Sequence, residues 1–163
     1  MAVYKIERKQ LIHSTVDELW AFFSSPDNLA AITPPYMNFR ITSESSKHGI
    51  YAGQIITYKV SPILGIPLYW MTEITHVEHH KRFVDEQRIG PYSMWHHQHY
   101  FEATAEGVWM TDLVHYRLPF YFIGNLAHHL FLKRQLEGIF DYRYRQIESL
   151  FTKAPNNSAS LNV

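Results

Sequence analysis

The sequence predicts an α+β domain in which an antiparallel sheet of seven strands packs against one long C-terminal helix. Residues 37–118 are rich in Ile, Val, Thr, Tyr and Trp and are interrupted by Gly, Pro and charged turns, which is typical of consecutive strands. After residue 125, apolar side chains recur at three- and four-residue spacing, which is typical of a helix. Because helices are expected only near the two ends of the chain, the strands between them should form one antiparallel sheet.

The N-terminal segment predicts one strand followed by two short helices. Residues 4–13 alternate polar and apolar side chains with the period of a strand. Thr15 and Glu18 have the spacing of a capping box, so the first helix should begin directly after Thr15. Pro26 suits the first turn of the second helix, and Thr33-Pro34-Pro35 must end it.

The remaining strands are expected at residues 37–45, 53–61, 68–78, 82–89, 93–104 and 108–118. Their connections are short, so consecutive strands should pair antiparallel. The long helix is expected at residues 126–151, with Asn125 as its N-cap. Its apolar stripe consists of Leu132, Leu136, Ile139, Phe140, Ile147 and Leu150. Residues 1–152 should thus form a single domain, and residues 153–163 a disordered tail.

The composition excludes several classes of protein. Fifteen basic residues balance 15 acidic residues without forming a block of either sign, so no nucleic-acid partner is expected. The chain has no cysteine, which excludes disulfides and thiolate chemistry. Its first residues are charged, and no apolar run approaches the ~20 residues of a membrane span. We therefore expect a cytoplasmic protein that does not insert stably into a membrane.

The most distinctive segment reads GPYSMWHHQHYF over residues 90–101. With residues 83–87 before it, residues 112–119 after it, Ile32-Thr33-Pro34-Pro35 and Pro67-Leu68-Tyr69-Trp70, it resembles one bacterial branch of the SRPBCC superfamily. Members of that branch are described as START-like or polyketide cyclase/dehydrase-like ligand-binding domains. The resemblance covers residues 4–151 and departs at Phe120-Tyr121-Phe122, where many relatives carry glycine after the proline.

This resemblance implies a helix-grip fold like that of the birch pollen allergen. In such a fold a curved sheet curls around the C-terminal helix, and a cavity lies between them. At superfamily level, relatives bind lipids, sterols, quinones or polyketides, and some are cyclases. The resemblance implies no particular reaction, and no cofactor is expected.

Side-chain alternation predicts which residues face the interior. A short turn at residues 105–107 would set Phe101 opposite Met110, and the same register sets His99 opposite Asp112. The predicted ligand-binding residues are Tyr58, Trp70, Asp85, Gln87, Trp95, His97, His99, Phe101, Asp112 and Tyr116. Unpaired polar groups are costly in a sealed core, so we interpret this interior as wet and open to a ligand.

Three hypotheses for the function follow from this set. The first is a binding or carrier protein for a small, mostly apolar or amphipathic ligand (a lipid, isoprenoid, quinone or polyketide-like molecule), whose polar head His97, His99 and Asp112 would anchor. The second is a cyclase or dehydratase in which His99, oriented by Asp112, acts as the general base. The third is an interaction module without a ligand, which would form a homodimer through the outward-facing Tyr69, Tyr100 and Trp109.

Two features of the predicted site have competing interpretations. The His97-x-His99 spacing also occurs in metal sites on β scaffolds, with Asp112 as a third ligand. We expect no metal, and instead hydrogen bonds from these histidines to Asp112, Tyr116 and water. Asp85 and Gln87 could contact the ligand or could bond to the loop at residues 90–92, and both interpretations stay open.

Overall fold

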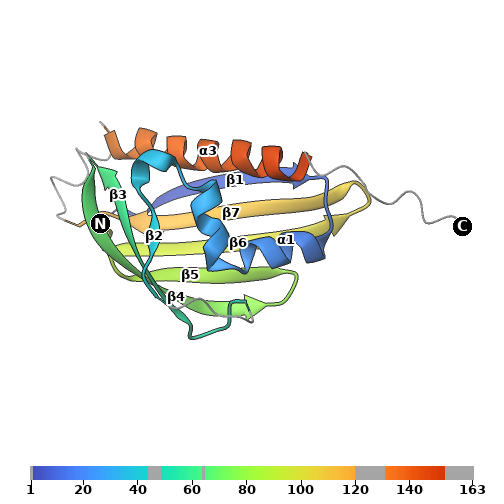
Figure 1. The fold of residues 1–163 in the computed structure, drawn as a ribbon, viewed down its shortest axis with the longest axis horizontal. Coiled ribbons are helices and arrows are strands. Elements are labelled where there is room, and N and C mark those ends of the chain that lie inside the picture. Colours follow the sequence, from blue (N-terminus) through green and yellow to red (C-terminus); the bar gives the residue numbers. More distant parts are fainter. Residues whose placement is uncertain (1, 44–48, 64, 120–130, 153–163) are drawn as a thin grey trace, which may run out of the picture.

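The computed structural model describes residues 2–43, 49–63, 65–119 and 131–152. Figure 1 shows a curved sheet with the long C-terminal helix lying along it and the N-terminal helices packed beside it. The elements are β1 (Tyr4–Ile12), α1 (Val16–Phe23), the 3-10 helices η1 (Pro26–Ile32) and η2 (Pro35–Met37), β2 (Arg40–Ile41), β3 (Ile55–Ile63), β4 (Ile66–Glu78), β5 (Arg82–Ile89), β6 (Met94–Thr104), β7 (Gly107–Arg117) and α3 (Lys133–Thr152).

The seven strands form one sheet in the order β1-β7-β6-β5-β4-β3-β2. The strands from β2 to β7 pair antiparallel with their neighbours in sequence, as the short connections predicted. The first strand, β1, lies at the far edge and pairs antiparallel with β7. One edge strand of the described sheet, β1, therefore makes the pairing with the largest sequence separation, and the other edge strand, β2, is only 2 residues long.

The curvature of the sheet has a visible cause on one side. The β3–β4 register shifts between Val60 and Ile63, and the β4–β5 register shifts twice. Such irregularities bend a strand and increase its twist. In contrast, β1, β7 and β6 pair in continuous register. The sheet thus curls mainly through β3, β4 and β5, and its concave face receives α3.

The N-terminal helices follow their sequence signals closely. The Thr15 hydroxyl accepts a hydrogen bond from the Glu18 amide at 3.2 Å, and the Glu18 carboxylate accepts one from the Thr15 amide at 3.4 Å. This capping box starts α1, which buries Leu19, Trp20 and Phe23 against the sheet. The second predicted helix forms as the 3-10 helix η1, which ends at Ile32 before the two prolines.

The strand predicted at residues 37–45 is wrong for most of its length. Pro35 begins the 3-10 helix η2, and Asn38 takes a left-handed conformation with φ 47° that an extended strand cannot contain. Only Arg40 and Ile41 pair with β3, and residues 44–48 lie outside the described residues. The β propensity of this segment is therefore overridden by the prolines before it.

The long helix is described from Lys133 to Thr152. The predicted Asn125 cap, the Phe120-Tyr121-Phe122 departure and the predicted tail lie outside the described residues. Leu136, Phe140 and Ile147 are buried against the sheet, whereas Leu150, which we assigned to the apolar stripe, is 43% exposed. Among the helices that the structure describes, none combines the length and the apolar character needed to cross a membrane.

Candidate functional site

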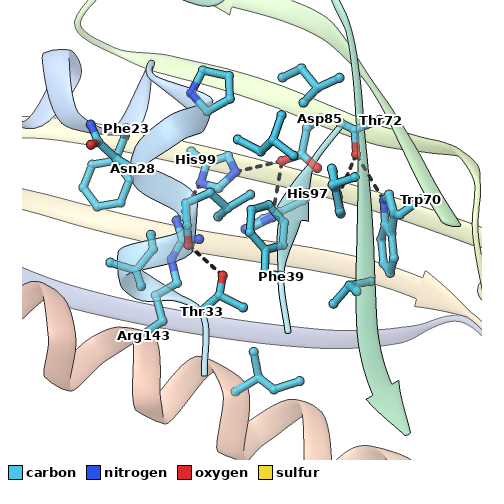
Figure 2. Close-up of a pocket in the computed structure, with 18 of the residues that line it drawn as sticks. Phe23, Asn28, Thr33, Phe39, Trp70, Thr72, Asp85, His97, His99 and Arg143 are labelled. Carbon is cyan, nitrogen blue, oxygen red and sulfur yellow. Dashed lines mark hydrogen bonds and ion pairs between the residues drawn. The ribbon is translucent and has the colours of Figure 1, made fainter. Parts of the chain in front are cut away.

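A cavity of about 200 Å³ lies between the concave face of the sheet, α3 and the 3-10 helices. Most of its wall is apolar and includes Ile56, Val60 and Ile74 from the sheet and Ile139 and Phe140 from the helix. One part of the wall is polar. Figure 2 shows Asp85, His97 and His99 reaching it from the sheet and Arg143 reaching it from α3.

The β6–β7 hairpin places the central groups of this polar wall. Its register pairs Phe101 with Met110, His99 with Asp112, and Trp95 with Tyr116, so the register predicted from the turn is confirmed. Burial alternates strictly along β7, where every second residue from Val108 to Tyr116 is buried. These even-numbered residues, together with the odd-numbered residues of β6, project to the concave face.

Asp112 lies behind the two histidines and contacts both. Its Oδ1 accepts a hydrogen bond from His97 Nε2 at 3.2 Å and lies 2.8 Å from His99 Nδ1. At 2.8 Å two lone pairs would repel, so we assign a proton to His99 Nδ1. Arg143 Nη2 is also near that nitrogen, at 3.4 Å, and this longer contact is the weaker one. Asp112 thereby fixes both rings.

Asp85 on β5 contacts the opposite nitrogens of the same two rings. Its Oδ2 lies 2.8 Å from His99 Nε2, which donates a hydrogen bond to it. The same oxygen lies 3.4 Å from His97 Nδ1, without the alignment of a hydrogen bond. The two imidazoles therefore stand between two carboxylates, and their ring centroids are only 3.8 Å apart.

Arg143 is the cation that holds this cluster from the helix side. Its Nε lies 3.0 Å from Asp112 Oδ2, and its Nη2 donates to Asp112 Oδ1 at 3.3 Å. The Nε contact is an ion pair without hydrogen-bond alignment, since Nε has no aligned partner among the described residues. Arg143 is 8% exposed, and its guanidinium lies over the Phe23 ring at 5.4 Å. A buried arginine is tolerated because it pairs with Asp112.

The surroundings set the charges of the cluster. Burial raises the pKa of Asp112, but the charge of Arg143 and the hydrogen bonds of the histidines lower it more, so the net pKa lies well below 3.8. Burial also raises the pKa of Asp85, and the neighbouring imidazoles and Arg143 again lower it to below 3.8. Both groups are therefore carboxylates near neutral pH.

The two histidines differ in charge. Burial lowers the pKa of His99, but the hydrogen bonds and charges of Asp112 and Asp85 raise it more, so its net pKa is raised. Burial and the neighbouring His99 lower the pKa of His97, and the two carboxylates only partly offset this. Two negative charges are thus balanced by two positive ones, on His99 and Arg143, which explains why the cluster can be buried.

A second group of polar atoms lies on another wall of the cavity. The Thr72 hydroxyl lies 3.0 Å from the Tyr58 hydroxyl and accepts a hydrogen bond from Trp70 Nε1 at 3.1 Å. The Tyr58 and Trp70 rings stack at 5.8 Å, and Trp95 packs edge-on to Trp70 at 5.5 Å. Burial, with the nearby charge of Asp85, raises the pKa of Tyr58, so this phenol stays neutral.

The predicted ligand-binding residues divide into two sets. The cavity is lined by six of them, namely Tyr58, Trp70, Asp85, Trp95, His97 and His99. The other four, Gln87, Phe101, Asp112 and Tyr116, do not line it. Asp112 lies behind the histidines, Tyr116 packs under α3 with Leu136 and Phe140, and Phe101 packs against Trp20 and Phe23. Phe101 and Tyr116 face the interior as predicted, but other side chains cover them.

Gln87 has a structural role, in line with its alternative interpretation. Its side-chain amide donates to the Tyr92 carbonyl at 2.6 Å and accepts from the Tyr92 amide at 3.2 Å. A Cβ atom at Gly90 would overlap the Gln87 side chain, so only glycine leaves room for this clamp. Tyr92 is thereby held over the cavity, where it packs against Trp95.

Arg143 is the residue of this site that the sequence interpretation missed. It occupies a place in the α3 stripe between Leu136, Phe140 and Ile147, where helical spacing calls for an apolar side chain. A charged residue inside an apolar stripe was therefore the available signal. It should have indicated a buried anion on the facing sheet.

Of the three outward aromatic residues proposed as a docking patch, Tyr69 lies apart from Tyr100. Tyr100 pairs with Arg82, which pairs with Glu78 at one end of β4, whereas Tyr69 lies nine residues away along β4. That separation is about 30 Å at strand spacing. Trp109 lies under the ammonium group of Lys9, 4.9 Å from its ring centroid. Tyr69 therefore does not share one compact patch with Tyr100, whereas Trp109 lies diagonal to Tyr100 on the neighbouring strand.

Comparison with known proteins identifies the fold. No family model and no curated protein sequence matches the chain. Among solved structures, TTHA0849 from Thermus thermophilus is similar with a TM-score of 0.67 and 13% identity, over 93% of this chain and 100% of that one. CV1439 from Chromobacterium violaceum has a TM-score of 0.69 and 10% identity, over 92% and 98%.

A plant protein shares the same architecture. The ginseng major latex-like protein 151 from Panax ginseng matches with a TM-score of 0.63 and 12% identity, over 91% of this chain and 97% of that one. These similarities, with the sheet curled around α3, show the helix-grip fold that the family resemblance implied. At these identities they define the fold alone.

Proposed function

We propose that the protein binds a small, mostly apolar molecule in the cavity, with the polar end of the ligand at the wall formed by Asp85, His97, His99 and Arg143. The observation that carries the proposal is the cavity itself, which is apolar on most of its surface and polar on one wall. Binding sites for small molecules typically combine these two features. The helix-grip architecture supports the proposal because it leaves this space between sheet and helix.

The volume of the cavity limits the ligand. An engineered cavity of about 150 Å³ is large enough for benzene. The cavity here, at about 200 Å³, therefore suits a molecule of about two fused rings, or the ring or chain end of a longer one. Quinones, isoprenoids, acyl chains and polyketide-like aromatics all contain a part of this size.

The polar wall favours a hydroxyl group on the ligand. Among the described residues, Asp85 Oδ1 and Arg143 Nη1 make no hydrogen bond, although both residues line the cavity. The first atom accepts hydrogen bonds and the second donates them. A hydroxyl can do both, so we propose a hydroxylated apolar ligand, such as a phenol or an alcohol.

The test compares naphthalene with 2-naphthol, which differ only in the hydroxyl. We expect both to raise the melting temperature of the protein, with 2-naphthol binding more tightly by calorimetry. Val60→Phe places a ring into the cavity and should abolish both effects, because Val60 lines the cavity. Native mass spectrometry of freshly purified protein would identify a co-purified natural ligand.

The matched control for this variant is Ile55→Phe on the same strand. Ile55 is 45% exposed, so the added ring stays outside the cavity and binding should be unchanged. The proposal fails if neither compound, nor a wider panel of lipids and quinones, shifts the melting temperature. It also fails if Val60→Phe binds as well as Ile55→Phe.

The cyclase or dehydratase alternative has less support in this geometry. A histidine that acts as a general base needs an unprotonated ring nitrogen that can reach the substrate. Nε2 of His99 donates to Asp85 at 2.8 Å, and Nδ1 faces Asp112 at the same distance. A substrate would therefore have to displace Asp85 before His99 could accept its proton. Turnover by the purified protein that is lost in Asp112→Asn would favour this alternative.

A further inference from the structure

Three potential metal-ligand atoms converge on one point of the polar wall. Asp85 Oδ2 lies 2.8 Å from His99 Nε2 and 3.4 Å from His97 Nδ1. All three residues offer ligand atoms within 4.8 Å of one another. Two ligands at about 2.0–2.1 Å from one ion are about 2.9 Å apart at octahedral angles and about 3.4 Å apart at tetrahedral angles. The two measured separations correspond to these values.

The opposite nitrogens of the two rings are held by a single carboxylate. His97 Nε2 lies 3.2 Å from Asp112 Oδ1, and His99 Nδ1 lies 2.8 Å from the same oxygen. Histidines that ligate metals typically donate their other N–H to such an outer carboxylate, which fixes the tautomer and the ring orientation. With Asp112 accepting both protons, neutral rings direct their remaining lone pairs at Asp85.

The Asp85 carboxylate and two imidazole lone pairs in contact with it require a cation between them. Without a metal, this is the proton that His99 Nε2 donates to Asp85 Oδ2. That proton satisfies one nitrogen only, since His97 Nδ1 makes no aligned hydrogen bond to Asp85. A single ion at that point would satisfy all three atoms together.

We propose that Asp85, His97 and His99 form a binding site for a divalent transition-metal ion, with Asp112 and Arg143 as the outer residues that orient the two rings. Two imidazoles and one carboxylate are the ligand set of several catalytic zinc sites and of non-haem iron sites. Imidazole ligands favour zinc, iron, cobalt or nickel over magnesium or calcium.

The placement of the residues separates an inner shell from an outer one. Asp85, His97 and His99 line the cavity, whereas Asp112 does not. The rings are also fixed by packing, because Phe83 stacks on His99 at 4.1 Å and Phe140 packs edge-on to His97 at 5.7 Å. The remaining coordination positions of the ion face the cavity and would accept water or a ligand oxygen.

This proposal replaces the expectation, drawn from the sequence, that the two histidines bind no metal. It also changes the third ligand, since Asp85 takes the place that the sequence suggested for Asp112. The proposal does not depend on an organic ligand, because metal binding is measured without one. Failure of one proposal therefore leaves the other intact.

The experiment measures binding of Zn²⁺ to protein that has been stripped with EDTA, by competition with a chromophoric chelator. We expect one tight site per chain. His97→Gln and His99→Gln should each weaken that site on the order of 100-fold or more, because each removes a ligand. Asp85→Asn should weaken it as well. Circular dichroism and thermal unfolding in EDTA show which variants remain folded.

His96→Ala is the matched control. His96 lies on the same strand and pairs with Glu86 at 2.8 Å on the other face of the sheet, so its removal should leave the tight site unchanged. Co²⁺ provides a second readout, since a visible absorption band should appear in the wild type and in His96→Ala and be lost in His99→Gln. The proposal is overturned if the folded His97, His99 and Asp85 variants bind Zn²⁺ as tightly as His96→Ala.

Discussion

The two ends of the interior share strands β5 and β6 but are filled differently. At one end, Trp20 from α1 packs edge-on against Phe83 and Phe101 at 6.0 and 5.8 Å, and Val108 and Met110 complete the contact. At the other end, inward-facing side chains of β3 to β6 line a cavity. Strand alternation therefore decides which side chains point inward, whereas the covering helices decide whether those side chains meet protein or open space.

Phe101→Ala should have the largest effect on stability at the filled end. Phe101 is 5% exposed and is surrounded by rings, so its truncation leaves a void that costs about 3–5 kcal/mol. Urea unfolding measures this loss. The folded variant should bind 2-naphthol like the wild type, and a variant that loses binding while keeping its stability would contradict the division of the interior.

Arg143→Met should cost a comparable amount at the polar wall, for an electrostatic reason. It leaves the Asp112 carboxylate buried without its guanidinium, and breaking a buried ion pair in this way costs about 3–5 kcal/mol. Adding Asp112→Asn removes the orphaned charge and should recover part of the loss. A double variant no more stable than Arg143→Met would show that the guanidinium acts through packing alone.

A phenylalanine introduced at each end of the interior allows a direct comparison of the loss of stability. Val108→Phe should destabilise by about 1–3 kcal/mol, because Val108 is 1% exposed and the space around it is filled. Val60→Phe should cost less, since its ring enters the cavity. Differential scanning calorimetry of the two variants tests this. Equal losses would mean that the cavity closes around the wild-type valine in solution.

The pH dependence should show the smallest effect. The pKa of Asp112 is lowered below 3.8 in the folded protein, so its contribution to stability is present above that pH and is lost as the pH falls through the folded pKa. Asp112→Asn should therefore reduce stability at pH 7 and flatten the decline between about pH 5 and 2. Urea titrations in EDTA measure both, and an unchanged acid slope would contradict this pKa.

The sheet and the hairpin at its centre could be predicted because they depend on local signals. A short turn with glycine fixed the β6–β7 register, and period-two alternation fixed the side chains that face inward. The segment at residues 37–45 failed because the conformation around Pro35 and Asn38 outweighs its strand-like composition. Propensity is a weak guide where the backbone is constrained.

The candidate site was only partly predictable for a different reason. His97, His99 and Asp112 share one hairpin, so their proximity follows from register. Arg143 reaches them from α3, and Asp85 bridges both rings only because β5 pairs with β6 at His97. Likewise, Phe101 does not reach the cavity because Trp20 and Phe23 of α1 cover it. A local pattern can mark Arg143 as an exception in the apolar stripe, but it does not name the partners of such long-range contacts.

The pairing of β1 with β7 also has a consequence for synthesis of the chain. Tyr4 finds its partner, Tyr116, only after more than a hundred further residues have been added. At about 5–20 residues per second, ribosomes need on the order of 5–20 s for this stretch. Throughout that interval β1 has no edge to join. A chaperone that meets the nascent protein before β7 is made would therefore find β1 without its partner.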